Sequence, residues 1–417
     1  MSKKILFATI GSLGDLHPCI ALGLELKRRG YQIVIASTAA YRARVESLGL
    51  GFHAIRPEWQ PGDRGLIAQC EDLRTGPEVL FRKLVLPHLE HTYTDLLAAA
   101  RSTDLMIAGE LVFAAPLVAE KLGLPWVSAI LSPTSFFSAY DPSLLVNAPW
   151  LLKLRRAGWH VNKAALEMGL RFTRHWWKPV RDLRRKEGLR PECSPLTRDK
   201  FSPHLVLALF SRSFAEPQPD WPESTVQTGF VFYDGESAGT REEEQLRAFL
   251  DAGEPPLVFT LGSTAVNHPG SFYESSLLAV RRLGKRAILL GAPKEVGKAT
   301  GDILRLPYAP YSQVFPRASV IVHQGGSGTT GRALQAGRPM LFVPYGWDQP
   351  DNAVRVERLG AALMVPRAKY AEETSAAALS RLLNEPDFTW NASMLGKKLA
   401  KEDGLTRACN AVELLLK

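Results

Sequence analysis

The chain has 417 residues, which is more than one typical domain holds and predicts two. Hydrophobic residues make up 46% of it, enough for a sizeable core, and no apolar run reaches the roughly 18 residues of a membrane-spanning helix. The formal net charge of +9 suits an anionic ligand, a nucleic acid or a membrane surface, without choosing among them. The four cysteines are scattered without metal-ligand spacing, which predicts reduced thiols in a cytoplasmic protein: Cys19, Cys70, Cys193 and Cys409.

The first half alternates strand-like and helix-like segments. Residues 5–10 are apolar and predict a first buried strand rather than a signal peptide. A helix is expected over 16–29 and a second strand over 31–36, which makes a βαβ unit. Such a unit predicts a parallel sheet with helices on both faces, and further strands are expected over 104–108 and 127–130.

The second half repeats this plan. Its expected buried strands are 256–261, 287–290, 320–322 and 340–343. A proline-rich stretch over 216–222 and a polar stretch over 234–244 lie between the halves and predict the linker.

One region, over 149–186, breaks the pattern, because many Lys and Arg residues surround Trp150, Trp159, Trp176 and Trp177. One interpretation is a pair of solvated helices whose aromatic rings pack inward. The other is a lid over an apolar substrate, or a patch that contacts a membrane surface. The sequence leaves both open.

The most informative run is residues 323–331, His-Gln-Gly-Gly-Ser-Gly-Thr-Thr-Gly. It follows a strand-like segment and leads into a helical pattern, so it presents backbone N–H groups to a phosphate. Residues 326–331 also satisfy G-x-G-x-x-G, with Asp348 about 20 residues further on, as in dinucleotide-binding proteins. The late position of the turn, and an acidic residue beyond the strand end, argue against a nicotinamide cofactor.

A matching turn, residues 11–18, follows the first strand and opens the first helix. Asp15 has two interpretations there. It is an ordinary N-cap, or it stands with His17 at the lip of a cleft as a general base.

Three segments, 11–18, 308–313 and 323–352, make the chain resemble a family 1-type glycosyltransferase with the two-domain GT-B fold. Within that family the chain is most similar to the bacterial glycopeptide-type and sterol-type enzymes, because they too have Gly-Asp at the start of the first helix. The His-x-Gly-Gly-x-Gly-Thr run and the later Asp-Gln-Pro carry most of the resemblance, which extends over nearly the whole chain.

The resemblance implies an α/β fold of two Rossmann-like, doubly wound domains facing a central cleft. Residues 1–232 would bind the acceptor and residues 233–395 the nucleotide sugar. A C-terminal helix within 396–417 would pack back on the first domain.

The resemblance also implies the residues that bind the donor, a UDP-sugar or a dTDP-sugar. His323 and the N–H groups of the turn would hold the diphosphate, Ser263 would add a phosphate donor, and Tyr308 would lie near the nucleobase. The full set is Gly14, Ser263, Tyr308, His323, Gly325, Gly326, Ser327, Gly328, Thr329, Asp348 and Gln349, of which the last two would bond the sugar hydroxyls.

The implied reaction is a direct displacement that inverts the anomeric configuration, with no cofactor and no metal ion. Asp15 matches the catalytic base, and His17 is the alternative. A carboxylate of ordinary pKa, near 4, is weak against an aliphatic alcohol; a phenol of pKa about 10, or burial that raises the pKa of the carboxyl, suits it better. Two departures from the family are Gln324, expected to be harmless, and Gly331, where many relatives have a Glu that contacts ribose.

The acceptor is expected to be small and apolar: a flavonoid or other phenolic, a polyketide, a sterol or a lipid. Phe136, Phe137 and Glu110 would contact it, although Glu110 has equally good interpretations as a group that orients the base and as a surface or capping residue. Two rival functions are a nucleotide-sugar epimerase and a non-catalytic nucleotide-sugar-binding protein. No nucleic-acid partner is expected, and the sequence leaves the oligomeric state open.

Overall fold

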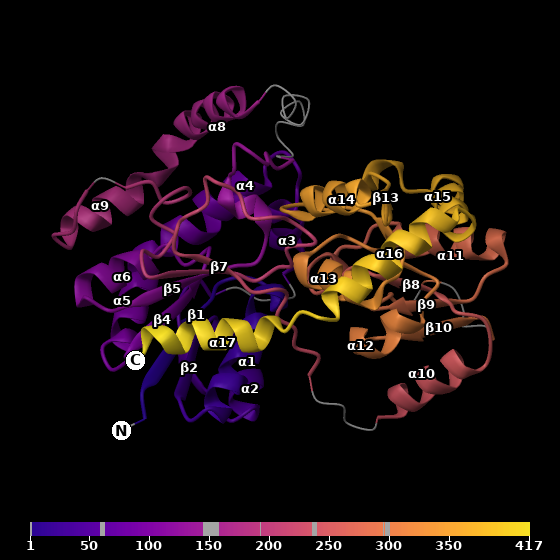
Figure 1. The fold of residues 1–417 in the computed structure, drawn as a ribbon, viewed down its shortest axis with the longest axis horizontal. Coiled ribbons are helices and arrows are strands. Elements are labelled where there is room, and N and C mark those ends of the chain that lie inside the picture. The colour runs from indigo at the N-terminus through magenta and orange to yellow at the C-terminus, as the bar shows by residue number, and fades with distance from the viewer. Residues whose placement is uncertain are drawn as a thin grey trace. The chain divides into compact units, whose positions relative to one another are not determined.

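The computed structural model describes residues 2–58, 63–144, 158–191, 193–235, 240–294, 296 and 301–417. Trp150 of the tryptophan-rich region and residues 236–239 of the expected linker lie outside this set. The chain forms two compact units, each built on one parallel sheet (Figure 1). Unit 1 contains Met1–Asp63, Arg74–Tyr233 and Asp403–Lys417, and unit 2 contains Arg64–Leu73 and Asp234–Glu402.

The sheet of unit 1 has the strand order β3-β2-β1-β4-β5-β6-β7, and every neighbouring pair is parallel. Its inner strands are nearly continuous apolar runs because helices cover both faces of the sheet. The strands are β1 Lys4–Ala8, β2 Gln32–Ser37, β3 Gly51–Ala54, β4 Leu105–Gly109, β5 Trp126–Ile130, β6 Leu205–Ala208 and β7 Thr225–Gln227.

The α-helices of unit 1 are α1 Leu13–Arg28, α2 Arg42–Ser47, α4 Gly76–Glu78, α5 Leu89–Ala100, α6 Ala115–Leu122, α8 Trp159–Thr173, α9 Lys178–Lys186 and α17 Gly404–Leu415. The C-terminal helix α17 lies along α1 (Figure 1). It places Ala408, Cys409 and Val412 in the unit 1 core, and Arg29 bonds Asn410 and Glu413 across the contact.

The sheet of unit 2 is also parallel, with the order β10-β9-β8-β11-β12-β13. Its strands are β8 Leu257–Thr260, β9 Ala287–Leu290, β10 Ile303–Leu306, β11 Val320–His323, β12 Met340–Phe342 and β13 Ala362–Met364. Its α-helices are α3 Arg64–Cys70, α10 Arg241–Asp251, α11 Phe272–Leu283, α12 Tyr311–Val314, α13 Ser327–Ala336, α14 Gln349–Arg358, α15 Glu372–Asn384 and α16 Pro386–Leu399. A buried cluster centred on Phe259, Tyr273 and Leu341 forms its core.

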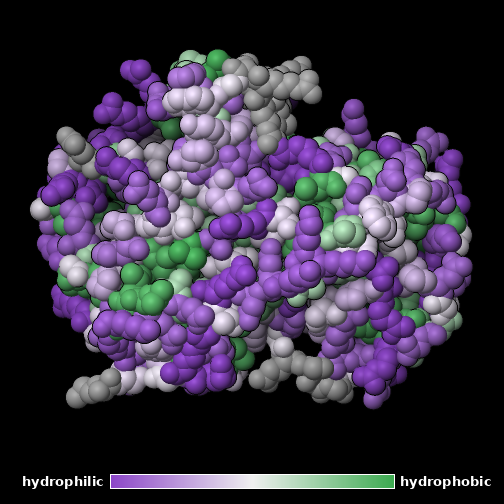
Figure 2. All heavy atoms as spheres, viewed as in Figure 1, coloured by the Kyte–Doolittle hydropathy of each residue, from purple (hydrophilic) through white to green (hydrophobic). Residues whose placement is uncertain are grey.

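The tryptophan-rich region contains α8 and α9. Trp177 packs inward against the rings of Phe81 and Phe113, with centroids 5.4 and 5.0 Å away. Nearly all of α8 is exposed, and the surface over it, at the top of Figure 2, mixes apolar and polar side chains. Among the described residues no helix is both long and apolar enough to cross a membrane.

Two features of the division were not expected. The predicted boundary at residue 396 lies inside α16, which continues to Leu399, and the chain returns to unit 1 only at Asp403. Residues 64–73, far from the linker in sequence, group with unit 2.

Candidate functional site

Three neighbouring strands of unit 2 deliver most of the predicted donor residues. The strand order reverses between β8 and β11, where His323 is paired with Thr260, and β12 lies next to β11. Parallel α/β sheets bind ligands where the order reverses, beyond the carboxyl ends of the strands. The loop after β8 carries Ser263, the loop after β11 is the glycine turn, and the loop after β12 carries Asp348 and Gln349.

His323 is fully buried at the end of β11. Its Nδ1 accepts a hydrogen bond from the Gly325 backbone N–H at 3.1 Å, so the ring hydrogen is on Nε2. Burial lowers the pKa of His323 to about 3, which keeps the ring neutral at physiological pH. Within the described part of the chain, the buried Nε2 has no hydrogen-bond partner. An unsatisfied buried donor is costly, so it points to a ligand that accepts from it.

The glycine turn brings backbone N–H groups to the same place. Gly325 has φ +101°, and a Cβ there would lie 3.0 Å from both the Gln349 carbonyl oxygen and the Phe342 ring, so only glycine fits. Gly326 is the N-cap of α13 and offers no side-chain cap, and the first turn of the helix has no acidic residue. The N-terminus of α13 therefore presents its first N–H groups and its dipole to an anion.

Asp348, the N-cap of α14, is held from two sides. Its Oδ2 accepts from the Ser327 hydroxyl at 2.7 Å and from the Asn352 amide at 2.9 Å. The fully buried Asn352 amide also donates to the Gly325 carbonyl oxygen at 2.9 Å, so one side chain joins the glycine turn to the loop after β12. Asn352 is not among the predicted site residues, although its i,i+4 spacing from Asp348 at a helix start was a usable signal.

The side chain of Gln349, predicted to contact the sugar, makes a contact within the protein. Its Oε1 accepts from the backbone N–H groups of Tyr345 at 2.8 Å and Gly346 at 3.1 Å. The amide oxygen therefore holds the loop, and the amide nitrogen is the group left to donate. Trp347, which lies between Gly346 and Gln349 in the sequence, has φ 60°, an uncommon conformation for a residue with a side chain.

The two remaining donor residues of unit 2 lie in loops beyond β8 and β10. Ser263 follows Gly262, and a Cβ on Gly262 would lie 2.2 Å from the Gln324 amide. Gln324, one of the two residues that depart from the family pattern, thus packs against the loop after β8. Tyr308 is 58% exposed, and its hydroxyl donates to the Asp234 carbonyl oxygen at 2.9 Å.

The predicted catalytic residues of unit 1 lie where its own strand order reverses, between β1 and β4. Asp15 is not the N-cap of α1; Ser12 is, and its hydroxyl accepts from the Gly14 N–H at 3.0 Å. Asp15 closes the capping box, because its Oδ2 accepts from the Ser12 N–H at 2.7 Å. Glu110 directly follows β4, the neighbour of β1.

His17 is the weaker base candidate. Arg44 Nη1 lies 3.1 Å from His17 Nε2, and since a guanidinium only donates, Nε2 must accept. Burial first, and the charge of Arg44 second, lower the pKa of His17 to about 4. The atom that would take a proton is thus occupied, and the ring is a poor base at neutral pH.

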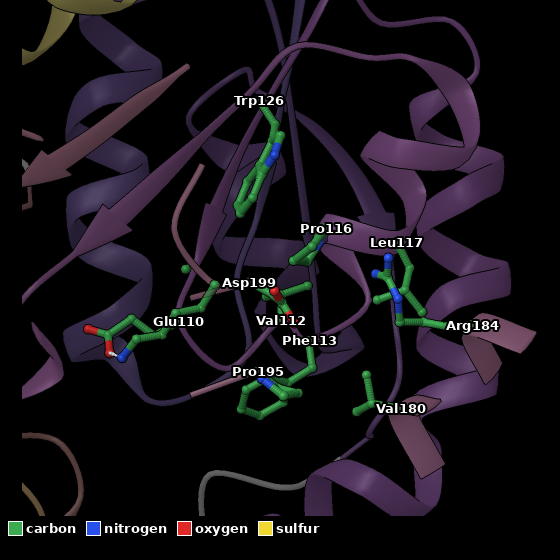
Figure 3. A pocket seen from close by; sticks show the side chains of 12 residues that line it. Glu110, Val112, Phe113, Pro116, Leu117, Trp126, Val180, Arg184, Pro195 and Asp199 are labelled. Carbon is green, nitrogen blue, oxygen red and sulfur yellow. Dashed lines mark ion pairs between the residues drawn. The ribbon is translucent and has the colours of Figure 1, made fainter. Parts of the chain in front are cut away.

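Of the predicted acceptor residues, Glu110 lines a narrow pocket of unit 1, and Phe136 and Phe137 do not (Figure 3). Glu110, Phe113 and Trp126 line it, and its space of about 10 Å³ holds about one water molecule. Glu110 lies 3.7 Å from the buried Lys200 ammonium, which sits over the Phe137 ring at 5.0 Å. Burial lowers the pKa of Lys200, and Glu110 opposes that shift.

Phe136 is more enclosed than the sequence indicated. It stacks on Phe201 with centroids 5.4 Å apart and on Trp221 at 4.1 Å, with interplanar angles of 11° and 13°. Both ring faces are covered, so only an edge of Phe136 is left for an acceptor.

The fold and site define a class: a protein of two parallel α/β units, one of which carries a buried histidine and a helix N-terminus suited to a diphosphate. Within the described ranges, no three or more His, Cys, Asp or Glu side chains are grouped so as to hold a metal ion.

Comparison with known proteins gives the family. Residues 5–140 match the glycosyltransferase family 28 N-terminal domain, and residues 288–410 match the erythromycin biosynthesis protein CIII-like C-terminal domain. The chain is 32% identical over 434 residues to the O-mycaminosyltylonolide 6-deoxyallosyltransferase of Streptomyces fradiae, covering 98% of this chain and 97% of that protein. It is 26% identical over 433 residues to the sterol 3-beta-glucosyltransferase of Yarrowia lipolytica, of which it covers 29%.

Solved structures agree on the fold. The spinosyn forosaminyltransferase SpnP superposes with a TM-score of 0.74 at 18% identity, over 100% of this chain and 99% of that one. The glycosyltransferase VinC, in complex with dTDP, superposes with a TM-score of 0.68 at 21% identity, over 98% of both chains. The chain therefore belongs to the family 1-type glycosyltransferases of GT-B fold, and it is a glycosyltransferase.

Proposed function

We propose that this enzyme moves a sugar from a UDP-sugar or dTDP-sugar to a hydroxyl of a small apolar acceptor, with inversion at the anomeric carbon. The observation that carries the proposal is the buried Nε2–H of His323, left without a partner among the described residues, beside the uncapped N-terminus of α13. Two features that each favour an anion meet at one strand end. The dTDP complex of VinC supports a nucleoside diphosphate as that anion.

His323 and α13 then stabilise the leaving group. As the bond from the anomeric carbon to the diphosphate breaks, negative charge grows on the diphosphate oxygens. Fixed donors aimed at that charge lower the barrier without having to reorganise. We therefore propose that transfer needs no metal ion, and that addition of EDTA leaves the rate unchanged.

Asp348 and Gln349 are proposed to hold the sugar. Asp348 has one oxygen tied by Ser327 and Asn352, so its orientation is set before the sugar arrives. Preorganised groups of this kind position the anomeric carbon at a lower entropic cost than mobile ones do.

Asp15 is proposed as the general base that takes the proton of the acceptor hydroxyl. Its carboxylate is fixed by the capping box at the start of α1, whereas His17 is occupied by Arg44. A carboxylate suits an acidic hydroxyl, so a phenol is favoured over an aliphatic alcohol.

Glu110 and Phe137 are proposed to contact the acceptor. Glu110 lines the pocket of unit 1, and the ring of Phe137 lies under Lys200, which lines it too. The lining combines apolar side chains such as Phe113 and Trp126 with charged ones, and the pocket must widen to admit an acceptor. The names of the relatives, an O-mycaminosyltylonolide 6-deoxyallosyltransferase and a sterol 3-beta-glucosyltransferase, support an apolar acceptor. We place the enzyme in the cytoplasm, where nucleotide sugars are available as donors.

A two-stage experiment tests the function. Thermal unfolding with UDP-glucose, dTDP-glucose and dTDP-rhamnose ranks the donors, because a ligand of the folded state raises the melting temperature by mass action. The best donor is then offered with phenolic, polyketide and sterol acceptors, and the anomeric configuration of the product is read by NMR. If none of the donors raised the melting temperature, or if the product retained the anomeric configuration, the proposal would be contradicted.

A peripheral membrane contact through α8 is a second part of the proposal. Val161, Met168 and Phe172 recur at i, i+7 and i+11, so they share one face, and they are 43%, 52% and 73% exposed. Exposed basic residues stand nearby: Arg171 on the flank of this face, and Arg174 and Lys178 just beyond the end of α8. An apolar stripe with basic flanks suits an anionic lipid surface.

Vesicle co-sedimentation tests this contact. Wild type should sediment with phosphatidylglycerol vesicles and not with phosphatidylcholine vesicles, and Phe172→Glu should remain in solution. Leu278→Glu, at an apolar residue of α11 that is 45% exposed, is the matched control and should sediment like wild type. If wild type did not sediment with the vesicles, or if Phe172→Glu sedimented as wild type does, the proposed membrane contact would be contradicted.

A further inference from the structure

The segment Arg64–Leu73, which contains α3, is part of unit 2 although the residues on both sides of it in sequence belong to unit 1. We call it the strap. Its Ile67 is buried, and α3 contacts the short helix Ala265–Asn267 in the loop after β8. The strap thus lies on one of the loops that form the candidate donor site, the loop that carries Ser263.

Glu71 at the end of the strap is a buried carboxylate that the reaction does not use. Its Oε2 lies 2.9 Å from Nε2 of His268, in the same loop after β8, and both side chains are largely removed from solvent. Within the described residues, neither carboxylate oxygen of Glu71 and neither ring nitrogen of His268 has a hydrogen-bond partner, so the 2.9 Å approach is a close contact without hydrogen-bond geometry. A buried pair with unsatisfied atoms is a poor source of stability, so a role in fixing geometry explains it better.

The strap also contacts the loop after β12. A Cβ on Gly346 would lie 2.9 Å from the Glu71 carbonyl oxygen and 3.1 Å from its Cα, so the two backbones meet directly. The ring of Tyr345 stands edge-on to His268 at 5.5 Å, and its hydroxyl donates to the Pro269 carbonyl oxygen at 2.7 Å.

These contacts connect the strap to the sugar residues. Tyr345 and Gly346 are the two residues whose N–H groups bond Gln349 Oε1, and Asp348 lies between them and Gln349 in sequence. Glu71 thus makes two contacts next to the loop that carries Asp348 and Gln349. Its carboxylate contacts His268, whose ring packs on Tyr345, and its backbone contacts Gly346.

We propose that Glu71 is a positioning residue for donor-sugar recognition, which acts by seating the strap on the loop that carries Asp348 and Gln349. This inference rests on the proposed function, because it takes these two residues as the sugar contacts. It separates two parts of the donor site. The glycine turn and His323 hold the diphosphate without the strap, and the loop after β12 holds the sugar only when the strap is seated.

The test compares a nucleotide sugar with its own diphosphate. Binding of dTDP-glucose and dTDP, or of UDP-glucose and UDP if wild type prefers uridine, is measured by calorimetry for wild type and Glu71→Gln. The variant keeps the shape of the side chain and removes its charge. We expect nucleotide-sugar affinity to fall about tenfold and diphosphate affinity to stay within about twofold, since a tenfold change is about 1.4 kcal/mol.

Two further variants keep the test decisive. Asp72→Asn removes the exposed neighbouring carboxylate of the strap and should bind both ligands like wild type. Gly346→Ala forces a methyl group against Glu71 from the other side and should reproduce the selective loss, even if Glu71→Gln folds poorly. Equal losses for both ligands, or no loss in either variant, would overturn the positioning role. Wild type that binds neither ligand would instead overturn the proposed function.

Discussion

Arg44 donates a hydrogen bond to His17 Nε2 at 3.1 Å, and this contact separates the two candidate bases of unit 1. The imidazole nitrogen that would accept a proton already accepts from a guanidinium, and the pKa of His17 is about 4. Asp15, two residues earlier, is fixed by the capping box of α1, in which its Oδ2 accepts from the Ser12 N–H at 2.7 Å.

Asp15→Asn should therefore reduce the transfer rate about a hundredfold or more, which is the usual contribution of a general base. His17→Gln should keep the rate within about fivefold of wild type, because the glutamine oxygen accepts from Arg44 in place of Nε2. Initial rates with a saturating donor measure both. If His17→Gln were the slower variant, the base assignment would have to be reversed.

His323→Asn should weaken binding of the nucleoside diphosphate about tenfold or more. The asparagine oxygen accepts from the Gly325 N–H as Nδ1 does, but the donor at Nε2 is lost. A hydrogen bond to a charged group contributes about 1.5–3 kcal/mol. Calorimetric titration measures the loss, with His53→Asn in unit 1 as the control, and unchanged affinity would show that Nε2 does not reach the phosphate.

Asn352→Ala should weaken binding of the nucleotide sugar and of its nucleoside diphosphate to the same extent, because Asn352 bonds both the glycine turn and Asp348. This differs from Glu71→Gln, for which only the nucleotide sugar is affected. The expected change is a donor KM about tenfold higher with the acceptor KM unchanged, since a buried amide that makes several hydrogen bonds contributes about 1–3 kcal/mol. Asn384→Ala, at an exposed helix position, is the control, and an effect confined to kcat would contradict this role.

Acid should destabilise the protein through its buried histidines. The folded-state pKa values of His17 and His323 are about 4 and about 3, below the value of about 6.5 of an unfolded chain. Between pH 6.5 and these values the unfolded chain binds more protons, so the free energy of unfolding falls as the pH falls, by at most about 1.4 kcal/mol per unit and histidine. Urea midpoints at pH 7, 6 and 5 measure this slope, and His323→Asn should make it shallower. An identical slope in that variant would mean that His323 is not buried as a neutral ring.

Much of the fold could be predicted from local patterns. The apolar runs that became β1, β2, β4, β5, β8, β9, β11 and β12 are visible because a parallel strand covered on both faces must be apolar throughout. The strands β3, β6, β7, β10 and β13 were not predicted, and all but β6 lie wholly or partly outside a continuous buried apolar run. The boundary at 396 was misplaced because it falls inside α16, whose residues continue the helix to Leu399.

The candidate site divides in the same way. His323, Gly325 and Asp348 could be proposed from the sequence because turns that present N–H groups need glycine and polar residues at short, regular spacings. Asn352 was missed, because its i,i+4 spacing from Asp348 indicates only that contact, and its bond to the glycine turn depends on the tertiary structure. Phe136 was expected at an acceptor surface, and stacking by Phe201 and Trp221, distant in sequence, encloses it instead.

By itself the sequence determined the alternation of strands and helices in two halves, the glycine turn and the family, because these are read from patterns of residues that are close along the chain. Only the tertiary structure decided which neighbours occupy the reactive atoms. Arg44 donates to Nε2 of His17, and Ser327 and Asn352 orient Asp348. Glu71 contacts His268, almost 200 residues later in the chain, and Gly346. Hydrogen bonding and burial set the protonation and orientation of a side chain, and both are fixed only when remote segments pack together.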